Sequence, residues 1–321
     1  MEESNQSNNQ IEPKKTEEVS NVLQSYSPYP IISPVAAAFI GLIGGFVLYQ
    51  FLGGLLTLLI FGFDLEAAPV NGLRLITIAG QILFILLPAL LFSKWIYGDV
   101  SKIILVKLPR LKEMLLFVIG IIILTPMLQS FLYIQNYFIE RWAESSQFIY
   151  SVKTLLDSLN ELIEKTFGNL MRADNIPEMI LVVLTISIVP AFCEEVLFRG
   201  YIQRSFELKF KPYFAAIITA IFFSAYHFNP YGIIPLAILG FYFGFAAYSS
   251  QSLIIPIILH FLNNFFAVML YFVIGDDELI TADVVDPASL NTNYLYFFSM
   301  LVLFVVLIIL IKQYYKKIKT A

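Results

Sequence analysis

Long apolar stretches fill most of the chain, and polar residues are confined to the links between them. A membrane-spanning helix needs about 20 mainly apolar residues. Stretches that meet or approach this length are residues 34–63, 75–92, 114–134, 180–199, 213–228, 232–248, 253–274 and 294–311. The pattern predicts an all-α polytopic membrane protein, built as a bundle of about eight transmembrane helices.

Composition supports this interpretation. Hydrophobic residues make up 58% of the chain and charged residues 14%, whereas soluble domains contain about 45–50% and about 25%. This surplus of apolar side chains exceeds what a soluble core can hold, so we expect much of it to face lipid. The net charge of −4 predicts no nucleic-acid partner.

The polar N-terminus differs from the rest of the chain. Residues 1–30 lack the apolar segment of a signal peptide and are predicted to form a disordered cytoplasmic tail. Residues 31–321 are predicted to form the membrane helix bundle.

Charged residues in the links predict the orientation, because cytoplasmic loops carry an excess of Lys and Arg. The links after the second and fourth stretches and the tail after the last are basic, whereas those after the first and seventh are acidic. We therefore expect both termini in the cytoplasm, in an integral protein of a bacterial cytoplasmic membrane.

The long link between Glu140 and Glu178 is predicted to lie outside. Apolar residues recur there at helical spacing from Val152 to Phe167, with charged residues between them. This pattern predicts an external amphipathic helix. Two roles remain open for it, an interfacial connector or a lid over a cavity.

Ionisable residues within the apolar stretches are rare and concentrated. They are costly in a bilayer and mark functional sites. Within about seventy residues the sequence places two carboxylates, an arginine, both histidines of the chain and two amides: Glu194, Glu195, Arg199, His227, His260, Asn263 and Asn264. The lone cysteine, Cys193, excludes an internal disulfide and is interpreted as an apolar packing residue.

Helical spacing assigns these side chains to different faces. Glu195 and Arg199 are four residues apart and can pair, whereas Glu194 points about 100° away from Glu195. A turn near residues 211–212 would bring Glu194 and His227 to the same depth. The turn 229–232 would then lie within the membrane, where its backbone would need protein cover.

These groups suit three interpretations. A carboxylate beside an imidazole can activate water, while a second imidazole with an amide can stabilise an oxyanion. The alternatives are a zinc site and a polar cluster that fixes helix packing. We expect that no cofactor is required; a bound metal would use Glu194, His227 and His260.

Three motifs also resemble those of a known family. They fall in order on separate predicted helices: Glu194-Glu195-Val-Leu-Phe-Arg199, Phe223-Ser-Ala-Tyr-His227 and His260-Phe-Leu-Asn-Asn264. They are similar to the EExxxR, FxxxH and HxxxN motifs of the CPBP family, the CAAX proteases and bacteriocin-processing enzymes, and thus to type II CAAX prenyl endopeptidases. The resemblance covers about residues 178–272, the expected protease core.

The resemblance implies an intramembrane endopeptidase of the CAAX-protease type. Glu194 would activate water with help from His227, and His260 and Asn264 would stabilise the oxyanion. Two residues would support the site, Glu195 and Arg199. The expected partners are the lipid bilayer and a peptide or protein substrate at the membrane, prenylated or not, cut near the cytoplasmic face.

The sequence leaves two other functions to consider. Some relatives are non-proteolytic bacteriocin-immunity or scaffolding membrane proteins with the same fold, and this is the alternative function. A secondary transporter is less consistent with the sequence, because transporters often contain inverted repeats and the polar groups here gather in one half of the chain.

Overall fold

The protein is helical throughout the described ranges. The computed structural model describes residues 30–65, 67–274 and 287–320, and no strand occurs in them. The predicted disordered tail lies outside the described residues except for Pro30, and the acidic link 275–286 lies wholly outside them.

Two helices, each widened by a π-helical turn, begin the bundle. The elements of this part are α2 (Pro34–Phe46), η1 (Val47–Gly53), α3 (Gly54–Phe61), α4 (Val70–Gly80), η2 (Gln81–Leu86) and α5 (Leu87–Tyr97). A 3₁₀ turn and two long helices follow: η3 (Val100–Lys102), α6 (Leu111–Ser145) and α7 (Gln147–Met171).

The central helix of the bundle is built from five consecutive elements. These are α8 (Ile176–Val182), η4 (Val183–Ile188), α9 (Val189–Glu195), η5 (Val196–Gln203) and α10 (Arg204–Glu207). The remaining elements are α11 (Pro212–Tyr226), α12 (Ile233–Ser250), α13 (Ile254–Ile274), η6 (Pro287–Ser289) and α15 (Leu290–Thr320).

Seven helices in the described ranges are long and apolar enough to span a membrane. They confirm the prediction of an all-α polytopic membrane protein. The remaining predicted span, residues 213–228, corresponds to α11, which has 15 residues and is therefore about 22 Å long, shorter than the roughly 30 Å hydrocarbon core of a bilayer. Most of the other spans extend beyond their predicted limits, because helical structure continues into the polar flanks.

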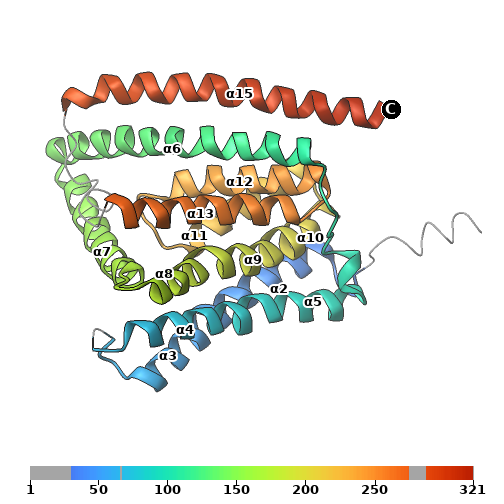
Figure 1. The fold of residues 1–321 in the computed structure, drawn as a ribbon, viewed down its shortest axis with the longest axis horizontal. Helices are drawn as coiled ribbons and strands as arrows, with labels where there is room; N and C mark the ends of the chain where they lie inside the picture. The colour runs from blue at the N-terminus through green and yellow to red at the C-terminus, as the bar shows by residue number, and fades with distance from the viewer. Residues whose placement is uncertain (1–29, 66, 275–286, 321) are drawn as a thin grey trace, which may run out of the picture.

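The helices are stacked so that the central helix lies in the middle of the bundle (Figure 1). The helices α15, α6, α12 and α13 lie on one side of it, and the pair formed by α2–α3 and α4–α5 lies on the other. Close packing on this second side depends on Gly41, where a Cβ atom would come within 2.5 Å of the Tyr201 ring. The Tyr201 hydroxyl donates a 2.8 Å hydrogen bond to the carbonyl of Ala37.

The predicted amphipathic helix is present as α7, which runs across one end of the bundle (Figure 1). It begins after the N-cap residue Ser146, whose backbone is extended and separates α7 from α6. Its C-terminal end is held by Arg74, which is 1% exposed. The Arg74 guanidinium donates to the carbonyls of Leu170, at 3.0 Å, and of Arg172.

The turn between α11 and α12 lies beneath α7 and is covered by protein. Gln135 on α6 donates a 2.9 Å hydrogen bond to the carbonyl of Tyr231. The Tyr231 hydroxyl donates to Asp157 on α7. The turn lies inside the bundle because α11 is short, and α6 and α7 supply the protein cover that was expected for it.

Candidate active site

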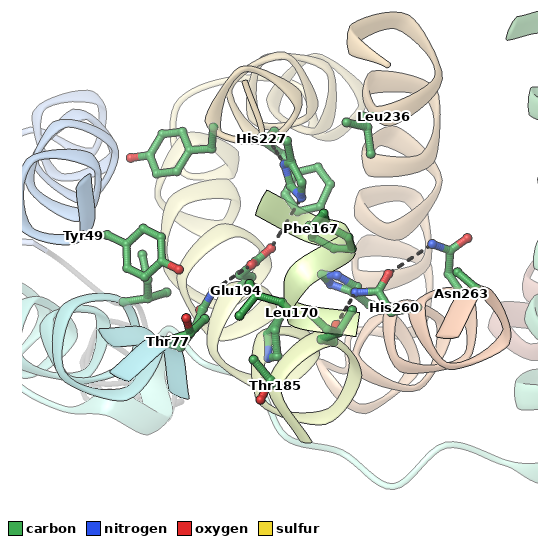
Figure 2. A pocket seen from close by; sticks show the side chains of 18 of the residues that line it. Tyr49, Thr77, Phe167, Leu170, Thr185, Glu194, His227, Leu236, His260 and Asn263 are labelled. Atoms are coloured by element: carbon green, nitrogen blue, oxygen red, sulfur yellow. Dashed lines mark hydrogen bonds and ion pairs between the residues drawn. The ribbon is translucent and has the colours of Figure 1, made fainter. Parts of the chain in front are cut away.

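A cavity of about 420 Å³ lies between the central helix and its neighbours, beneath the C-terminal end of α7. Figure 2 shows it from close by. The residues predicted as catalytic all line this cavity: Glu194, His227, His260 and Asn264. Other parts of the chain complete its wall, including Tyr49 of η1, Gln81 of η2 and Phe167 of α7.

Glu194 and His227 face each other across one side of the cavity. The Oε2 atom of Glu194 lies 3.9 Å from Nε2 of His227. The His227 Nδ1 atom is 2.7 Å from the carbonyl oxygen of Phe223. A carbonyl oxygen only accepts hydrogen bonds, so Nδ1 carries the proton and Nε2 of the neutral ring is an acceptor. Both side chains are partly exposed, at 15% for Glu194 and 32% for His227.

The two oxygen atoms of Glu194 have different surroundings. Oε1 accepts a 3.1 Å hydrogen bond from the amide of Gln81. Oε2 is buried and has no hydrogen-bond partner in the protein. Buried polar atoms are normally paired, so this oxygen can accept a hydrogen bond from a bound molecule, as can Oε1 of Gln81, which also has no partner.

Gln81 was not among the predicted site residues, because the prediction rested on ionisable residues and on the amides of the motifs. It belongs to the second predicted span, more than a hundred residues before Glu194 in the chain. A neutral amide in an otherwise apolar span is nevertheless costly to bury. A polar amide inside an apolar stretch is the sequence signal that could have identified Gln81.

Glu195 belongs to a separate, buried network, in which its own Oε2 atom and the Nε atom of Arg199 have no hydrogen-bond partner. Its Oε1 atom is 2.7 Å from Nη1 of Arg199, as the spacing predicted, and 2.9 Å from Nδ1 of His260. Arg199 also donates a 3.0 Å hydrogen bond to the carbonyl of Gly240 and lies 4.2 Å from the centre of the Phe223 ring. The side chains of Glu195 and Arg199 are fully buried.

The His260 ring is therefore held by a contact with Glu195 and by two aromatic rings. Its ring stacks on Phe243 with a centroid distance of 5.4 Å and meets the edge of Phe223 at 5.8 Å. The resemblance assigned His260 and Asn264 a joint role at the oxyanion, and both do line the cavity. The link from His260 to Glu195 joins different helices and was not predicted.

The amide of Asn264 is oriented by two contacts. Its Nδ2 atom donates a 2.9 Å hydrogen bond to the carbonyl of Ile186 in η4. Its Oδ1 atom accepts a 3.2 Å hydrogen bond from Asn263. An amide nitrogen carries two hydrogens, so Asn264 has one N–H left for a bound molecule.

The ionisable groups of the site are distributed between two carboxylates rather than gathered around one point. In the described part of the chain, no group of three or more His, Cys, Asp or Glu side chains is placed to hold a metal ion. His227 faces Glu194, whereas His260 binds Glu195. Cys193 is buried in the apolar cluster around the α2–α5 pair.

Comparison with known families identifies the central part of the chain. Residues 176–266 match the family model described as type II CAAX prenyl endopeptidase Rce1-like. The matched segment contains every motif that resembled the CPBP family. No curated protein and no solved structure matches the chain.

Proposed function

We propose that this integral membrane protein, whose residues 176–266 match the Rce1-like family model, is an intramembrane endopeptidase of the CPBP family. In this proposal it hydrolyses a peptide bond with a water molecule activated by Glu194. One observation carries the proposal, namely the unpartnered Oε2 atom of Glu194, which faces the cavity 3.9 Å from the accepting nitrogen of His227.

The distance between Glu194 and His227 suits a shared water molecule. At 3.9 Å the two atoms are too far apart for a direct hydrogen bond. One water can donate a hydrogen bond to each of them, because both are acceptors. Glu194 then takes one proton as general base, and the hydroxide oxygen attacks the carbonyl carbon of the peptide bond.

The oxyanion formed by this attack needs hydrogen-bond donors. Asn264 has a free N–H, and His260 presents its Nε2 atom. Glu195 accepts the proton on Nδ1 of His260, so Nε2 can donate only when the ring carries both protons. We therefore propose that His260 acts as an imidazolium supported by Glu195, and that Arg199 balances the charge of that carboxylate.

Collapse of the tetrahedral intermediate requires a proton on the leaving nitrogen. Glu194 holds the proton taken from water and returns it to the nitrogen as the C–N bond breaks. The products are a carboxylic acid and an amine, and Glu194 is restored. No covalent bond between enzyme and peptide forms in this sequence.

We propose that the reaction needs no metal cofactor. A zinc site would use Glu194, His227 and His260. In the described residues no group of three His, Cys, Asp or Glu side chains is placed to hold a metal ion, because His227 lies beside Glu194 and His260 beside Glu195. Zinc at this place would also occupy both imidazoles and leave none for water activation or oxyanion binding.

The protease core in this proposal is about residues 178–272, within a larger bundle. Eight cavity residues come from outside the core, five of them from the N-terminal helices and three from α7: Tyr49, Gln50, Thr77, Gln81, Ile85, Phe167, Leu170 and Met171. The N-terminal helices and α7 would therefore shape the site in addition to burying the core. The substrate itself is a peptide or protein at the membrane.

Comparison of membrane proteomes tests the proposal. Membranes containing the wild-type protein and the Glu194→Gln variant should differ in at least one substrate, which remains uncut in the variant. Size-exclusion chromatography in detergent should show both proteins folded and monodisperse. Equal cleavage by both would refute the mechanism, and no cleavage by either would favour a scaffolding or immunity role.

A further inference from the structure

We infer that the peptide reaches Glu194 from the non-cytoplasmic side of the membrane, and that the substrate is an apolar segment of an exported or membrane-anchored protein. The cleavage step in this inference rests on the proposed function. The side of access rests on two independent observations, the direction in which the cavity extends and the distribution of charge.

The cavity extends from Glu194 toward the end of the bundle that α7 crosses. Phe167, Leu170 and Met171 of α7 line it together with Glu194. Phe167 is 46% exposed, and His227 at the end of short α11 keeps 32% of its side chain exposed. The side of the site facing α7 is therefore the accessible one.

The opposite side of the site is closed by a layer of buried side chains. Every residue of η5, from Val196 to Gln203, is buried. Phe206 of α10, one turn further along, is also buried. Gln203 fills the space toward α12 and donates a 3.0 Å hydrogen bond to the carbonyl of Gly244. A peptide cannot reach Glu194 through this layer without unfolding the central helix.

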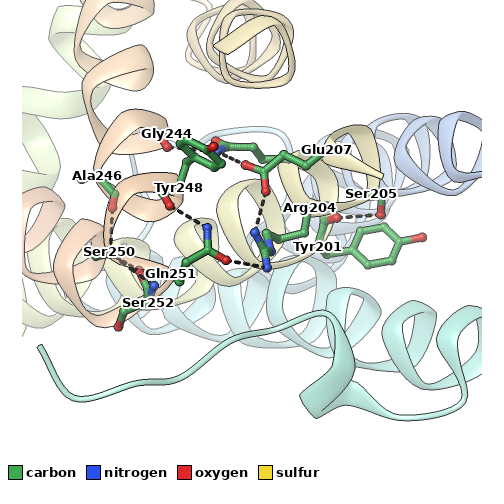
Figure 3. A network of polar contacts seen from close by, with 11 residues as sticks. Tyr201, Arg204, Ser205, Glu207, Gly244, Ala246, Tyr248, Ser250, Gln251 and Ser252 are labelled. Carbon is green, nitrogen blue, oxygen red and sulfur yellow. Dashed lines mark hydrogen bonds and ion pairs between the residues drawn. The ribbon is translucent and has the colours of Figure 1, made fainter. Parts of the chain in front are cut away.

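Basic residues gather at the closed end. The links 94–112 and 204–211 contain five and three Lys or Arg residues, and the end of α15 adds three more in 312–317. Figure 3 shows part of this end, where Arg204 binds Glu207 at 2.6 Å and Gln251 at 3.2 Å. The turn after α12 is joined to the link 94–112 through the backbone bond from Leu253 to Leu105.

The end of the bundle crossed by α7 carries more acidic than basic residues. The segment 140–175 contains four Lys or Arg residues and six Asp or Glu residues, and the link 62–69 contains two acidic residues and no basic one. Lys and Arg are enriched in cytoplasmic loops. The closed end therefore faces the cytoplasm, and the cavity faces the other side. The inferred side of access differs from the cytoplasmic face that was expected from the sequence.

The cavity also limits the substrate. One turn of helix, with a diameter of about 10–12 Å and a pitch of 5.4 Å, fills roughly 400–600 Å³. The cavity of about 420 Å³ therefore admits only about one turn of peptide. The wall of the cavity is mainly apolar and includes Leu236, Leu239, Ala267 and Val268 in addition to the α7 residues. This chemistry fits a short stretch of a signal peptide or a single membrane anchor, unwound at the scissile bond.

Thiol labelling of the full-length protein in intact bacterial cells tests the side of access. Single cysteines replace Phe167 in the cavity, Glu161 on the exposed face of α7 and Lys107 at the closed end, in a Cys193→Ala background. A parallel series keeps Cys193, whose thiol is 1% exposed, in case its replacement impairs folding. A membrane-impermeant maleimide is the probe.

The inference predicts that Phe167→Cys and Glu161→Cys react in intact cells, and that Lys107→Cys reacts only after permeabilisation. The reverse pattern would overturn the side of access, whatever the protein cleaves. So would labelling of Glu161→Cys without Phe167→Cys in intact cells, because the cavity would then be closed to that side.

Mapping of new protein termini in cells with wild-type protein and Glu194→Gln tests the substrate class. Cleavage sites lost in the variant should lie in the non-cytoplasmic half of signal peptides or membrane anchors. Sites in cytoplasmic tails would overturn the inference while leaving the protease function intact. Absence of any lost site would refute the proposed function and the substrate class together, and the labelling result would still decide the side of access.

Discussion

The half of the site around Glu194 and the half around Glu195 are built in opposite ways. Each carboxylate keeps its Oε2 atom without a hydrogen-bond partner, but Glu194 is partly exposed beside the cavity and its nearest ionisable partner, His227, is 3.9 Å away. Glu195 is fully buried between Arg199 and His260. The two residues are adjacent in sequence, but a rotation of about 100° per residue turns them toward different neighbours.

This contrast separates reactivity from support. A group that must take a proton has to be reachable by water, so it cannot also be locked in an ion pair. A buried charge, in contrast, must be paired, because an isolated one is very costly in a low-dielectric interior. The open half of the site supplies the chemistry in our proposal, and the closed half holds His260 in place.

The largest effect on activity is expected in the open half. Glu194→Gln keeps the size of the side chain and the contact to Gln81, but it cannot accept a proton. Cleavage of a peptide or native substrate in detergent should fall about 10²–10⁴-fold. Thermal unfolding should be nearly unchanged, since the Oε2 atom makes no hydrogen bond within the protein.

The closed half should respond in stability instead. Glu195→Gln leaves Arg199 as an unpaired buried charge, and breaking such a pair costs roughly 3–5 kcal/mol. We expect a lower yield of monodisperse protein and a lower Tm. Glu207→Gln is the matched control, because the Arg204–Glu207 pair is partly exposed. A normal Tm for Glu195→Gln would remove the distinction between the two halves.

His260 and Asn264 join the two halves, so their replacement tests the oxyanion assignment. His260→Ala and Asn264→Ala should each slow cleavage by about 10²–10³-fold through loss of a donor. His260→Ala should also lower the Tm, because Glu195 loses a partner. Wild-type kcat in Asn264→Ala would show that its remaining N–H does not face the reacting carbonyl.

A smaller effect is expected at Gln81, which acts by positioning Glu194. Gln81→Leu removes one hydrogen bond to a charged group, worth about 1.5–3 kcal/mol. We expect kcat to fall roughly ten- to hundred-fold, with KM little changed. Gln81→Glu would test the same contact by replacing a donor with a like charge. A changed KM with normal kcat would instead assign Gln81 to substrate binding.

No effect is expected from removal of metal ions. Activity of the purified protein should be unchanged after chelation, and elemental analysis should find no stoichiometric zinc. Glu194→Gln, assayed alongside, sets the level of lost activity. Stoichiometric zinc whose removal abolishes cleavage would merge the two halves into one metal site and overturn the comparison.

The fold was largely predictable from the sequence, because a helix that spans a lipid bilayer must consist mainly of apolar residues. Long apolar runs identified the membrane helices, and the recurring apolar residues of the long link identified α7. The C-terminal end of α11 was predicted two residues too late, at Phe228, because this apolar residue continues the apolar stretch although the helix ends at Tyr226. Apolar composition does not reveal where a chain leaves the helical conformation.

The site was predicted in part, for a related reason. Spacing within one helix identified the pair of Glu195 and Arg199, because residues four apart share a face. It could not show that His260 binds Glu195 or that Gln81 binds Glu194. These contacts join helices that are distant in sequence, and their geometry depends on how the whole bundle packs.

The buried layer of η5 has a further consequence, for the energy stored across the membrane. A hydrolase within a bilayer must admit water, yet a continuous file of water and ionisable groups would conduct protons. Each elementary charge that crosses dissipates about 2.3 kcal/mol per 100 mV. Because the cavity ends against Phe198 and the rest of η5 is buried, water that enters the cavity at Glu194 would be separated from the basic end of the bundle, so the protein could hydrolyse a peptide without dissipating the membrane potential.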